Sequence, residues 1–339
     1  MKHWIRILTL LLSLFSILSL VACNGDEGKT ADTVPKDTEG TPTNEEESTA
    51  MPTDSLKEKN YRVILSSDVH YTYLEAWYGW TSEDRMQHWV DSIIEEHKKN
   101  PVDLVIIAGD TSLDHWASNG SYTKDKISTT ETFVKNYISQ LPEEIEVFVS
   151  PGNHEQFNDE QWLKLTGNRR QGSVALGNNL FVMLDTFSQN LEPNYKGNPL
   201  DSPADVAFVR SEMAKHPECK NVYLVAHYFH TGVQSEEFKA LLKDSRVRGL
   251  FQGHTHQSSI VTLGAEFGGK KIAQTGNFSY TGESASADAV KNSFWGFREL
   301  IITPESAISS YIVTRTRIVI DGKEIVSLNR TLTHRVRFY

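Results

Sequence analysis

Five short, mainly apolar runs recur along the chain. Each spans five to seven residues, a length and composition typical of strands that are buried on both faces of a sheet. Between the first three runs, residues 82–99 and 128–141 carry apolar side chains at helical spacing, which predicts a helix in each segment. Because strand and helix alternate here, the pattern predicts parallel pairing with right-handed crossovers. The runs are 61–65, 102–108, 145–149, 221–226 and 247–252.

The second half of the chain is patterned differently. The Gly-Asn-Asn sequence at 177–179 separates two short apolar segments, which is typical of a β-hairpin. A Ser-Pro pair at 202–203 is expected to open a helix that runs to about residue 216. Two further helical segments are predicted at 159–165 and 235–243. From about residue 260 to 339 we expect an antiparallel part, with strands at 260–263, 271–274, 297–302, 309–320 and 324–329.

These patterns predict an α/β fold made of two βα-type halves and an antiparallel tail, which gives two β-sheets with helices outside them. The predicted domain spans residues 59–339. A chain of this length can bury a sizeable core without disulfides. There are two cysteines, Cys23 and Cys219, and if Cys23 carries lipid then no internal disulfide is possible.

The first 23 residues have the pattern of a secretory signal. Lys2 and Arg6 precede an apolar run at 7–22, which ends in small residues before Cys23. This ending resembles the bacterial lipobox, which implies that Cys23 is lipidated and becomes the new N-terminus. An uncleaved membrane anchor is the alternative, because the run is nearly long enough to span a bilayer. Both readings predict an extracytoplasmic domain that is attached to a membrane, at a bacterial cell surface or in a periplasm.

Residues 24–58 have the composition of a disordered acidic tether. They hold ten acidic and three basic side chains and almost no large apolar ones, so they cannot bury enough surface to offset the entropy of ordering. They carry −7 of the total net charge of −10, which leaves the rest of the chain only mildly acidic. This balance argues against a nucleic-acid backbone as a partner.

Polar side chains that can bind metal follow each of the five apolar runs. Carboxylates and imidazoles mixed with one neutral amide suit Mn, Fe or Zn. Seven such ligands exceed the need of one ion, so two ions that share a bridging carboxylate are expected. Such pairs serve the hydrolysis of phosphate esters. The seven residues are Asp68, His70, Asp110, Asn153, His227, His254 and His256.

The order of these motifs resembles the calcineurin-like metallophosphoesterase family. The resemblance rests on Asp-x-His at 68–70, Gly-Asp at 109–110, Gly-Asn-His-Glu at 152–155, the histidine at 227 and Gly-His-x-His at 253–256. It covers about residues 60–257 and implies a sandwich of two mixed β-sheets flanked by helices, which agrees with the layers predicted above. It also implies a binuclear phosphoesterase, in which a metal-bridging hydroxide attacks the phosphorus of a small phosphate mono- or diester.

The resemblance assigns a role to each ligand. One ion would be held by Asp68, His70 and His256. The other would be held by Asn153, His227 and His254, and Asp110 would bridge the two ions.

The resemblance also implies a general acid. His154 would face the phosphate and protonate the leaving oxygen, which helps because an alkoxide is strongly basic. Many family members carry a second aspartate that orients this histidine. Here Asp114 stands one residue further along than in the family pattern, and it is the candidate for that role. Glu155 occupies a position that is often aspartate, a change we expect to be harmless.

Residues 71–80 contain five aromatic side chains directly after the first ligand loop. Among them Tyr71 and Trp77 are candidate substrate-binding residues that could stack a ring, and packing beneath the loop is an equal alternative. Arg169 and Arg170 could clamp a phosphate, although a solvated pair is the favoured interpretation.

Two other functions stay open at this point. A binding lipoprotein that has lost catalysis on the same scaffold would be expected to have a degenerate ligand set, which this chain does not have. A mononuclear iron enzyme with two histidines and one carboxylate would bind about one ion per chain.

Overall fold

Two β-sheets form the centre of the computed structural model, which describes residues 59–72, 80–113, 128–188, 201–279 and 293–339. The first sheet has the order β12-β11-β10-β1-β2-β3, and β13 also pairs with β11. β1, β2 and β3 are parallel to one another, whereas β10 runs antiparallel to β1. The strands are β1 (Tyr61–Ser66), β2 (Leu104–Ala108), β3 (Glu146–Ser150), β10 (Ser293–Thr303), β11 (Ser306–Ile320), β12 (Lys323–Ser327) and β13 (Thr331–Arg337).

The second sheet has the order β4-β5-β6-β7-β9-β8. β5, β6, β7 and β9 are parallel, and β4 and β8 lie antiparallel at the edges. The expectation of a wholly antiparallel segment after residue 260 is therefore wrong for β9. β8 reverses the chain direction, and a second reversal restores the direction of β7. The strands are β4 (Gly172–Leu176), β5 (Asn179–Leu184), β6 (Asn221–Ala226), β7 (Val247–Gln252), β8 (Ile260–Thr262) and β9 (Lys271–Gln274).

Polar side chains fix the starts of the helices. The Thr81 hydroxyl accepts a hydrogen bond from the Asp84 amide at 3.0 Å and caps α1. The predicted start of α4 at the Ser-Pro pair is wrong, because the Asp205 carboxylate accepts from the Phe208 amide at 2.9 Å and begins the helix there. The helices are α1 (Ser82–Lys99), α2 (Thr129–Asn136), α3 (Asp159–Thr166), α4 (Val206–Lys215) and α5 (Glu236–Leu242), with 3₁₀ turns at Ile138–Gln140, Thr231–Val233 and Ala265–Phe267.

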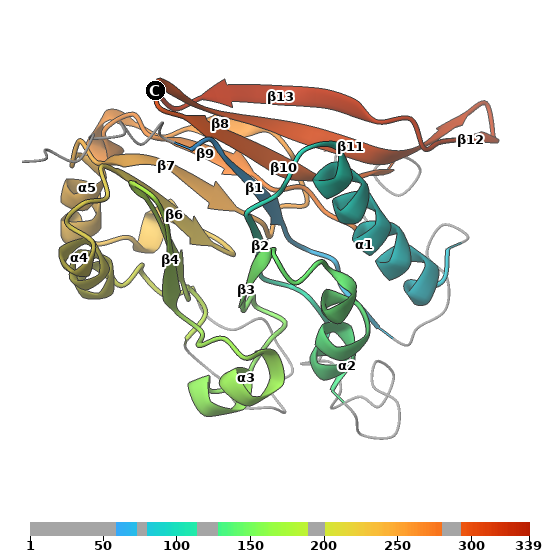
Figure 1. The fold of residues 1–339 in the computed structure, drawn as a ribbon, viewed down its shortest axis with the longest axis horizontal. Helices are drawn as coiled ribbons and strands as arrows, with labels where there is room; N and C mark the ends of the chain where they lie inside the picture. The colour runs from blue at the N-terminus through green and yellow to red at the C-terminus, as the bar shows by residue number, and fades with distance from the viewer. Residues whose placement is uncertain (1–58, 73–79, 114–127, 189–200, 280–292) are drawn as a thin grey trace, which may run out of the picture. The chain divides into compact units, whose positions relative to one another are not determined.

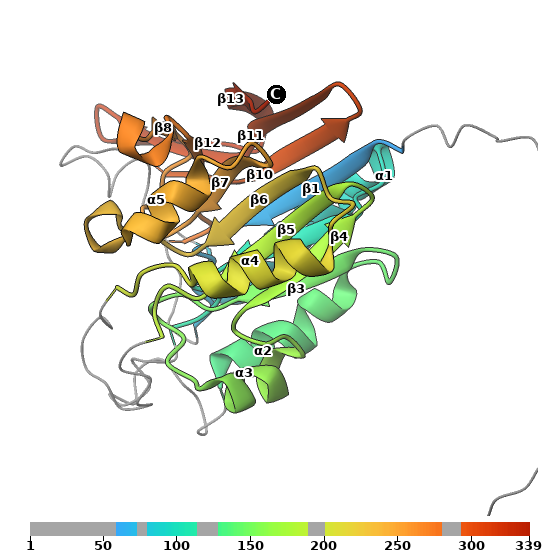
Figure 2. The same cartoon turned by 90° about the vertical axis from the view of Figure 1, so that its left-hand side faces the viewer.

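The buried side chains form three clusters that separate four layers. In β1, Val63 and Leu65 face the second sheet, whereas Ile64 faces α1 and packs with Trp89. A third cluster fills the space between the second sheet and the helices α4 and α5. Figure 1 shows α1 and α2 on one side of the sheets and α4 and α5 on the other, and Figure 2 shows the same layers from the side. The predicted sandwich of two mixed sheets flanked by helices is confirmed.

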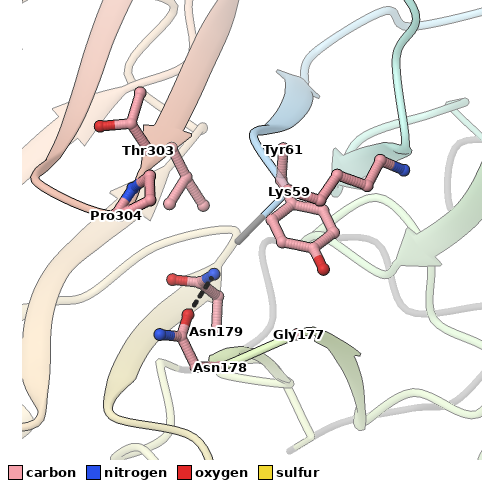
Figure 3. A pocket seen from close by; sticks show the side chains of 8 residues that line it. Lys59, Tyr61, Gly177, Asn178, Asn179, Thr303 and Pro304 are labelled. Carbon is pink, nitrogen blue, oxygen red and sulfur yellow. Dashed lines mark hydrogen bonds between the residues drawn. The ribbon is translucent and has the colours of Figure 1, made fainter. Parts of the chain in front are cut away.

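The two ends of the parallel strands differ in chemistry. At the amino-terminal ends, a small pocket of about 100 Å³ lies among Lys59, Tyr61, the 177–179 turn and Thr303 (Figure 3). It contains none of the predicted metal ligands, which all follow the carboxyl ends of the strands. In the part of the chain that the structure describes, no helix combines the length and the apolar composition needed to cross a membrane.

Candidate metal centre

Backbone hydrogen bonds hold the ligand loops against one another. In the first sheet, the Asp68 amide donates to the Gly109 carbonyl at 3.1 Å, and the His70 amide donates to the Asp110 carbonyl at 3.0 Å. A bond between the sheets runs from the His254 amide to Asp68 Oδ2 at 2.9 Å. These hydrogen bonds therefore join the backbones of the loops after β1, β2 and β7 to one another.

Five of the predicted ligands have a left-handed backbone, which is uncommon for residues other than glycine. Each costs about 1–2 kcal/mol relative to a relaxed conformation. Strain of this kind persists only where the surrounding structure holds it, and it concentrates at functional sites. The residues are Asp68 (φ 52°), His70 (48°), Asp110 (53°), His254 (68°) and His256 (58°).

Asp68, His70 and His256 form the first cluster of possible ligands. Their ligand atoms all lie within 4.8 Å of one another. Asp68 Oδ1 is 3.6 Å from His70 Nε2 and 3.3 Å from His256 Nε2. Asp68 Oδ2 accepts a hydrogen bond from the Ser67 hydroxyl at 2.5 Å, so the two oxygens of this carboxylate have different surroundings. Oδ1 is buried and accepts no hydrogen bond within the described residues, as expected of an atom that faces a cation.

Asn153, His227 and His254 form the second cluster. Asn153 Oδ1 lies 3.1 Å from His227 Nε2 and 3.0 Å from His254 Nδ1, and these two ring nitrogens are 3.3 Å apart. His227 Nδ1 lies 2.8 Å from the Ala108 carbonyl, which can only accept, so Nδ1 carries the proton. When the ring is neutral, this contact leaves the Nε2 lone pair available to a metal, as is usual for metal-binding histidines.

The Asp110 carboxylate lies between the two clusters. Its Oδ2 is 3.4 Å from His70 Nε2 and 3.1 Å from His227 Nε2. Its Oδ1 accepts a hydrogen bond from the His154 backbone amide at 3.1 Å. One oxygen is thus tied to the loop after β3, and the other faces both clusters.

His154 lies beside Asp110 and beside His70 of the first cluster. Its Nε2 is 3.7 Å from Asp110 Oδ2, and its ring centroid is 4.9 Å from that of His70. The ring nitrogen is close enough to His70 and Asp110 to complete a third set of possible ligands. Distance alone therefore permits both a proton-transferring and a ligating role for His154.

The buried charges shift one another's pKa values. Burial alone would raise the pKa of Asp110, but the imidazoles of His227, His154 and His70 together outweigh it and hold that pKa well below its usual range. In His227, burial opposes the charged form, and the carboxylate of Asp110 overcomes it and raises the pKa to about 10. A metal ion that binds His227 at neutral pH therefore has to displace a proton.

The residues present fit divalent metal ions. The donors are hard carboxylate and amide oxygens together with imidazoles, a set that suits Mn, Fe or Zn. Asp68 Oδ1 is buried without a hydrogen bond, and Asp110 Oδ2 lies between the ring nitrogens of His70 and His227, so both oxygens are placed to bind a cation. Among the described residues, the two clusters have no ligand in common apart from Asp110.

Residues 61–258 match the family model for calcineurin-like phosphoesterases. The match covers more than half of the 339-residue chain. The chain belongs to the calcineurin-like phosphoesterase family. Membership makes it a metal-binding hydrolase of phosphoesters in general character, which agrees with the ligand sets of the site.

Two solved structures are similar in fold. A dimetal phosphatase from Danio rerio shares 13% identity with a TM-score of 0.51, and the match covers 82% of this chain and 98% of that one. A purple acid phosphatase from yellow lupin (Lupinus luteus) seeds shares 13% identity with a TM-score of 0.52, covering 83% of this chain and 54% of that one. No curated protein matches the sequence. At such low identity, the structural matches establish the fold alone.

The structure describes one of the two predicted substrate-binding residues, Tyr71, and places it in the core. Tyr71 is only 2% exposed, and its ring packs at 5.4 Å from that of Tyr137 in the cluster beneath the helices. This is the position of a packing residue, the alternative considered for the aromatic segment. Trp77, Asp114 and Cys23 lie outside the described residues.

The two neighbouring arginines differ from each other. Arg169 is exposed and pairs with Asp159, as expected of a solvated residue. The same expectation is wrong for Arg170, which is buried because its guanidinium binds Asp185 at 2.7 Å and the Glu155 carbonyl at 2.9 Å. Arg170 therefore supports the loop that carries the candidate acid.

Two further charged residues support the ligand loops, and the sequence prediction missed them. Arg85 of α1 is fully buried and donates to the carbonyl of His70 at 2.9 Å, and also to that of Val69. Glu155 is fully buried between the loops after β2 and β3, and burial together with the Asp110 charge raises its pKa to about 7. The adjacency of Glu155 to His154 was a signal, although nothing local showed where its side chain points.

Proposed function

We propose that this protein hydrolyses a small phosphate mono- or diester with two divalent ions, which are Mn, Fe or Zn. Asp68, His70 and His256 hold one ion, and Asn153, His227 and His254 hold the other. The observation that carries the proposal is the position of Asp110 Oδ2, which lies 3.4 Å from His70 Nε2 and 3.1 Å from His227 Nε2. A carboxylate oxygen between two separate donor sets is what a binuclear centre requires.

Each part of the chain's chemistry follows from this arrangement. The bound ions supply Lewis-acid activation of a water molecule and neutralise charge on the phosphoryl oxygens. Asn153 adds an oxygen donor without adding negative charge beside an anionic substrate. His154 holds a proton at Nε2 beside the Asp110 carboxylate and delivers it to the leaving oxygen.

The first test is metal-dependent turnover. The purified full-length protein is stripped of metal, reloaded with Mn, Fe or Zn singly, and assayed on a bis-aryl phosphate diester and an aryl phosphate monoester. Asp110→Asn should remove activity by more than the roughly 10–100-fold typical of residues outside the ligand set. Asp103→Asn is the matched control, because this carboxylate binds the Arg62 amide at 2.8 Å just before β2 begins, at the opposite end of that strand.

Four results would contradict the proposal. Turnover without metal, or full activity of Asp110→Asn, would remove its basis. Two bound ions with no turnover of either ester would favour the binding lipoprotein, and a stoichiometry near one would favour the mononuclear enzyme. The ratio of diester to monoester rates assigns the substrate class.

A second test separates the two roles that distance permits for His154. If His154 is the general acid, His154→Ala should keep its metal content and lose more rate on an alkyl ester than on an aryl ester, because the alkoxide needs the proton more. The loss on the alkyl ester should be about 10²–10⁴-fold. Equal losses on both esters together with a lower metal content would instead make His154 a ligand.

We further propose that the protein is an extracytoplasmic lipoprotein. Support comes from the basic residues, the apolar run and the Ala-Cys ending of residues 1–23, followed by an acidic segment that suits a tether. Labelling of cells with a fatty acid should mark the wild-type chain, and Cys23→Ser should lose both the label and the membrane fraction. A labelled Cys23→Ser variant, or an unlabelled wild type in the cytoplasm, would contradict this localisation.

A further inference from the structure

The Glu155 carboxylate joins two ligand loops that follow neighbouring parallel strands. Oε2 accepts from the backbone amides of Asp110 at 3.0 Å and Gly152 at 2.7 Å. Oε1 accepts from the Ser112 amide at 2.9 Å and the Thr111 hydroxyl at 3.0 Å. Glu155 is fully buried, so these donors have no access to water as a substitute. One side chain therefore satisfies donors from both loops.

The packing of the loops explains why a carboxylate is needed here. β2 and β3 pair in parallel up to Ala108 and Ser150, and the chain then leaves both strands. The amides of Asp110 and Gly152 thus lie beyond the last sheet pairing. A buried amide without an acceptor costs about 1–3 kcal/mol. A carboxylate has about four acceptor positions, and a neutral amide side chain has fewer.

Glu155 and its neighbour together hold Asp110 at two points. The Glu155 side chain holds the Asp110 backbone amide at 3.0 Å, and the His154 amide holds Asp110 Oδ1 at 3.1 Å. With these two points fixed, Oδ2 is the oxygen that faces the ring nitrogens of His70 and His227. The Glu155 backbone is held in turn, because its carbonyl accepts from Arg170 at 2.9 Å.

We propose that Glu155 is a positioning residue that sets Asp110 as the shared ligand and thereby makes the site bind two ions rather than one. The inference rests on the proposed binuclear site. Glu155 itself binds neither ion, because both of its oxygens are occupied by donors of the two loops. Its loss should therefore affect the second ion more than the first, because Glu155 also binds the Gly152 amide, next to the second-cluster ligand Asn153. The first-cluster ligands Asp68, His70 and His256 follow β1 and β7 instead.

The test compares metal affinity in E155Q, E155D and E96Q. E155Q keeps the size of the side chain and loses the charge and one acceptor oxygen. E155D keeps the charge, and its shorter side chain cannot reach both loops. Glu96 is the matched control, because it is also a buried glutamate but lies in the last turn of α1, away from the ligand loops. There its carboxylate pairs with Arg62 at 2.6 Å.

The readouts are the number of Mn ions per chain, their affinities by chelator competition, the melting temperature of the metal-free protein, and kcat and KM. In E155Q and E155D, the affinity for the second Mn should fall about 10–100-fold, the first should change little, and excess Mn should restore part of kcat. E96Q should lower the melting temperature and leave both affinities unchanged.

Each alternative outcome is distinct. Wild-type affinity for two ions in a folded E155Q would overturn the inference and leave the proposed function intact. A failure of both Glu155 variants to fold would also overturn it, because the residue would then serve general stability. A wild-type protein that binds fewer than two ions would overturn the proposed binuclear site itself.

Discussion

Gly152 offers a steric test of the metal centre, because replacing it changes one contact and no charge. A Cβ atom at this position would lie 2.6 Å from the Asp110 backbone nitrogen and still closer to Asp110 Oδ1, whereas ordinary contacts begin near 3.4 Å. The loops of Gly152 and Asp110 must therefore move apart, by about 0.8 Å to reach an ordinary contact. Gly152 has no positive φ, so the alanine backbone itself is allowed and the effect is purely steric.

A shift of this size is large for a metal ligand. Bond lengths to divalent ions are held within about 0.2 Å, and a displacement of about 1 Å typically costs about 100-fold in rate. We therefore expect Gly152→Ala to lower kcat/KM about 100-fold, which corresponds to about 2.7 kcal/mol of transition-state stabilisation. The assay is hydrolysis of an aryl phosphate ester by Mn-loaded protein, with the metal content measured on the same sample.

Gly167→Ala is the matched control. Gly167 ends α3 with φ 78°, and no atom of the described residues lies within 4 Å of the point where a Cβ would sit, so alanine strains only its own backbone. The change should cost about 1–2 kcal/mol of stability and leave metal content and turnover unchanged. Wild-type metal content and activity in Gly152→Ala would refute the argument that Asp110 has no room to move.

Three further predictions concern stability. Removal of divalent ions should lower the melting temperature, because ions at 100 times their Kd stabilise the folded state by about 2.7 kcal/mol. An unchanged melting temperature after chelation would contradict this expectation. Burial lowers the pKa of His88 from 6.5 to about 4. The folded state therefore favours the neutral imidazole, so the protein has its full stability above pH 6.5 and loses stability as the pH falls towards 4. His88→Gln should therefore remove about 3 kcal/mol of acid destabilisation, measured by urea unfolding at pH 7 and pH 4, and identical pH profiles would refute it. The His256→Gly variant should bind fewer ions. Its metal-free melting temperature should be no lower than that of the wild type, because glycine relieves the backbone strain at φ 58°. A clearly lower melting temperature would count against stored strain.

The parts of the site that could be predicted from the sequence are those with a local signal. A mainly apolar run followed by a polar metal-binding residue marks the end of a buried strand, and this pattern located each of the seven candidate ligands. The strand pairing had no such signal. β10 pairs with β1 through Tyr61 and Ile302, which are far apart in the sequence, and the parallel pairing of β9 depends on a reversal in β8.

The supporting residues were harder to predict, because their roles depend on contacts between distant segments. Arg169 and Arg170 are adjacent and chemically identical, yet only Arg170 reaches Asp185 and is buried. Tyr71 follows a ligand directly, yet its ring lies in the core. Composition favours the surface for an arginine, and only the tertiary partners of Arg170 override that preference.

The strained backbone of the ligands shows how the site is kept in shape. Five left-handed residues at about 1–2 kcal/mol each are a sizeable fraction of the 5–15 kcal/mol that stabilises a typical domain. The contacts that hold them come from the protein itself, through the loop-to-loop backbone bonds, the Glu155 carboxylate and the Arg85 guanidinium. None of these contacts includes a metal ion, so the protein's own groups contribute to the placement of the ligands. The strained backbone is thus a cost of ligand placement, which agrees with the concentration of such strain at functional sites.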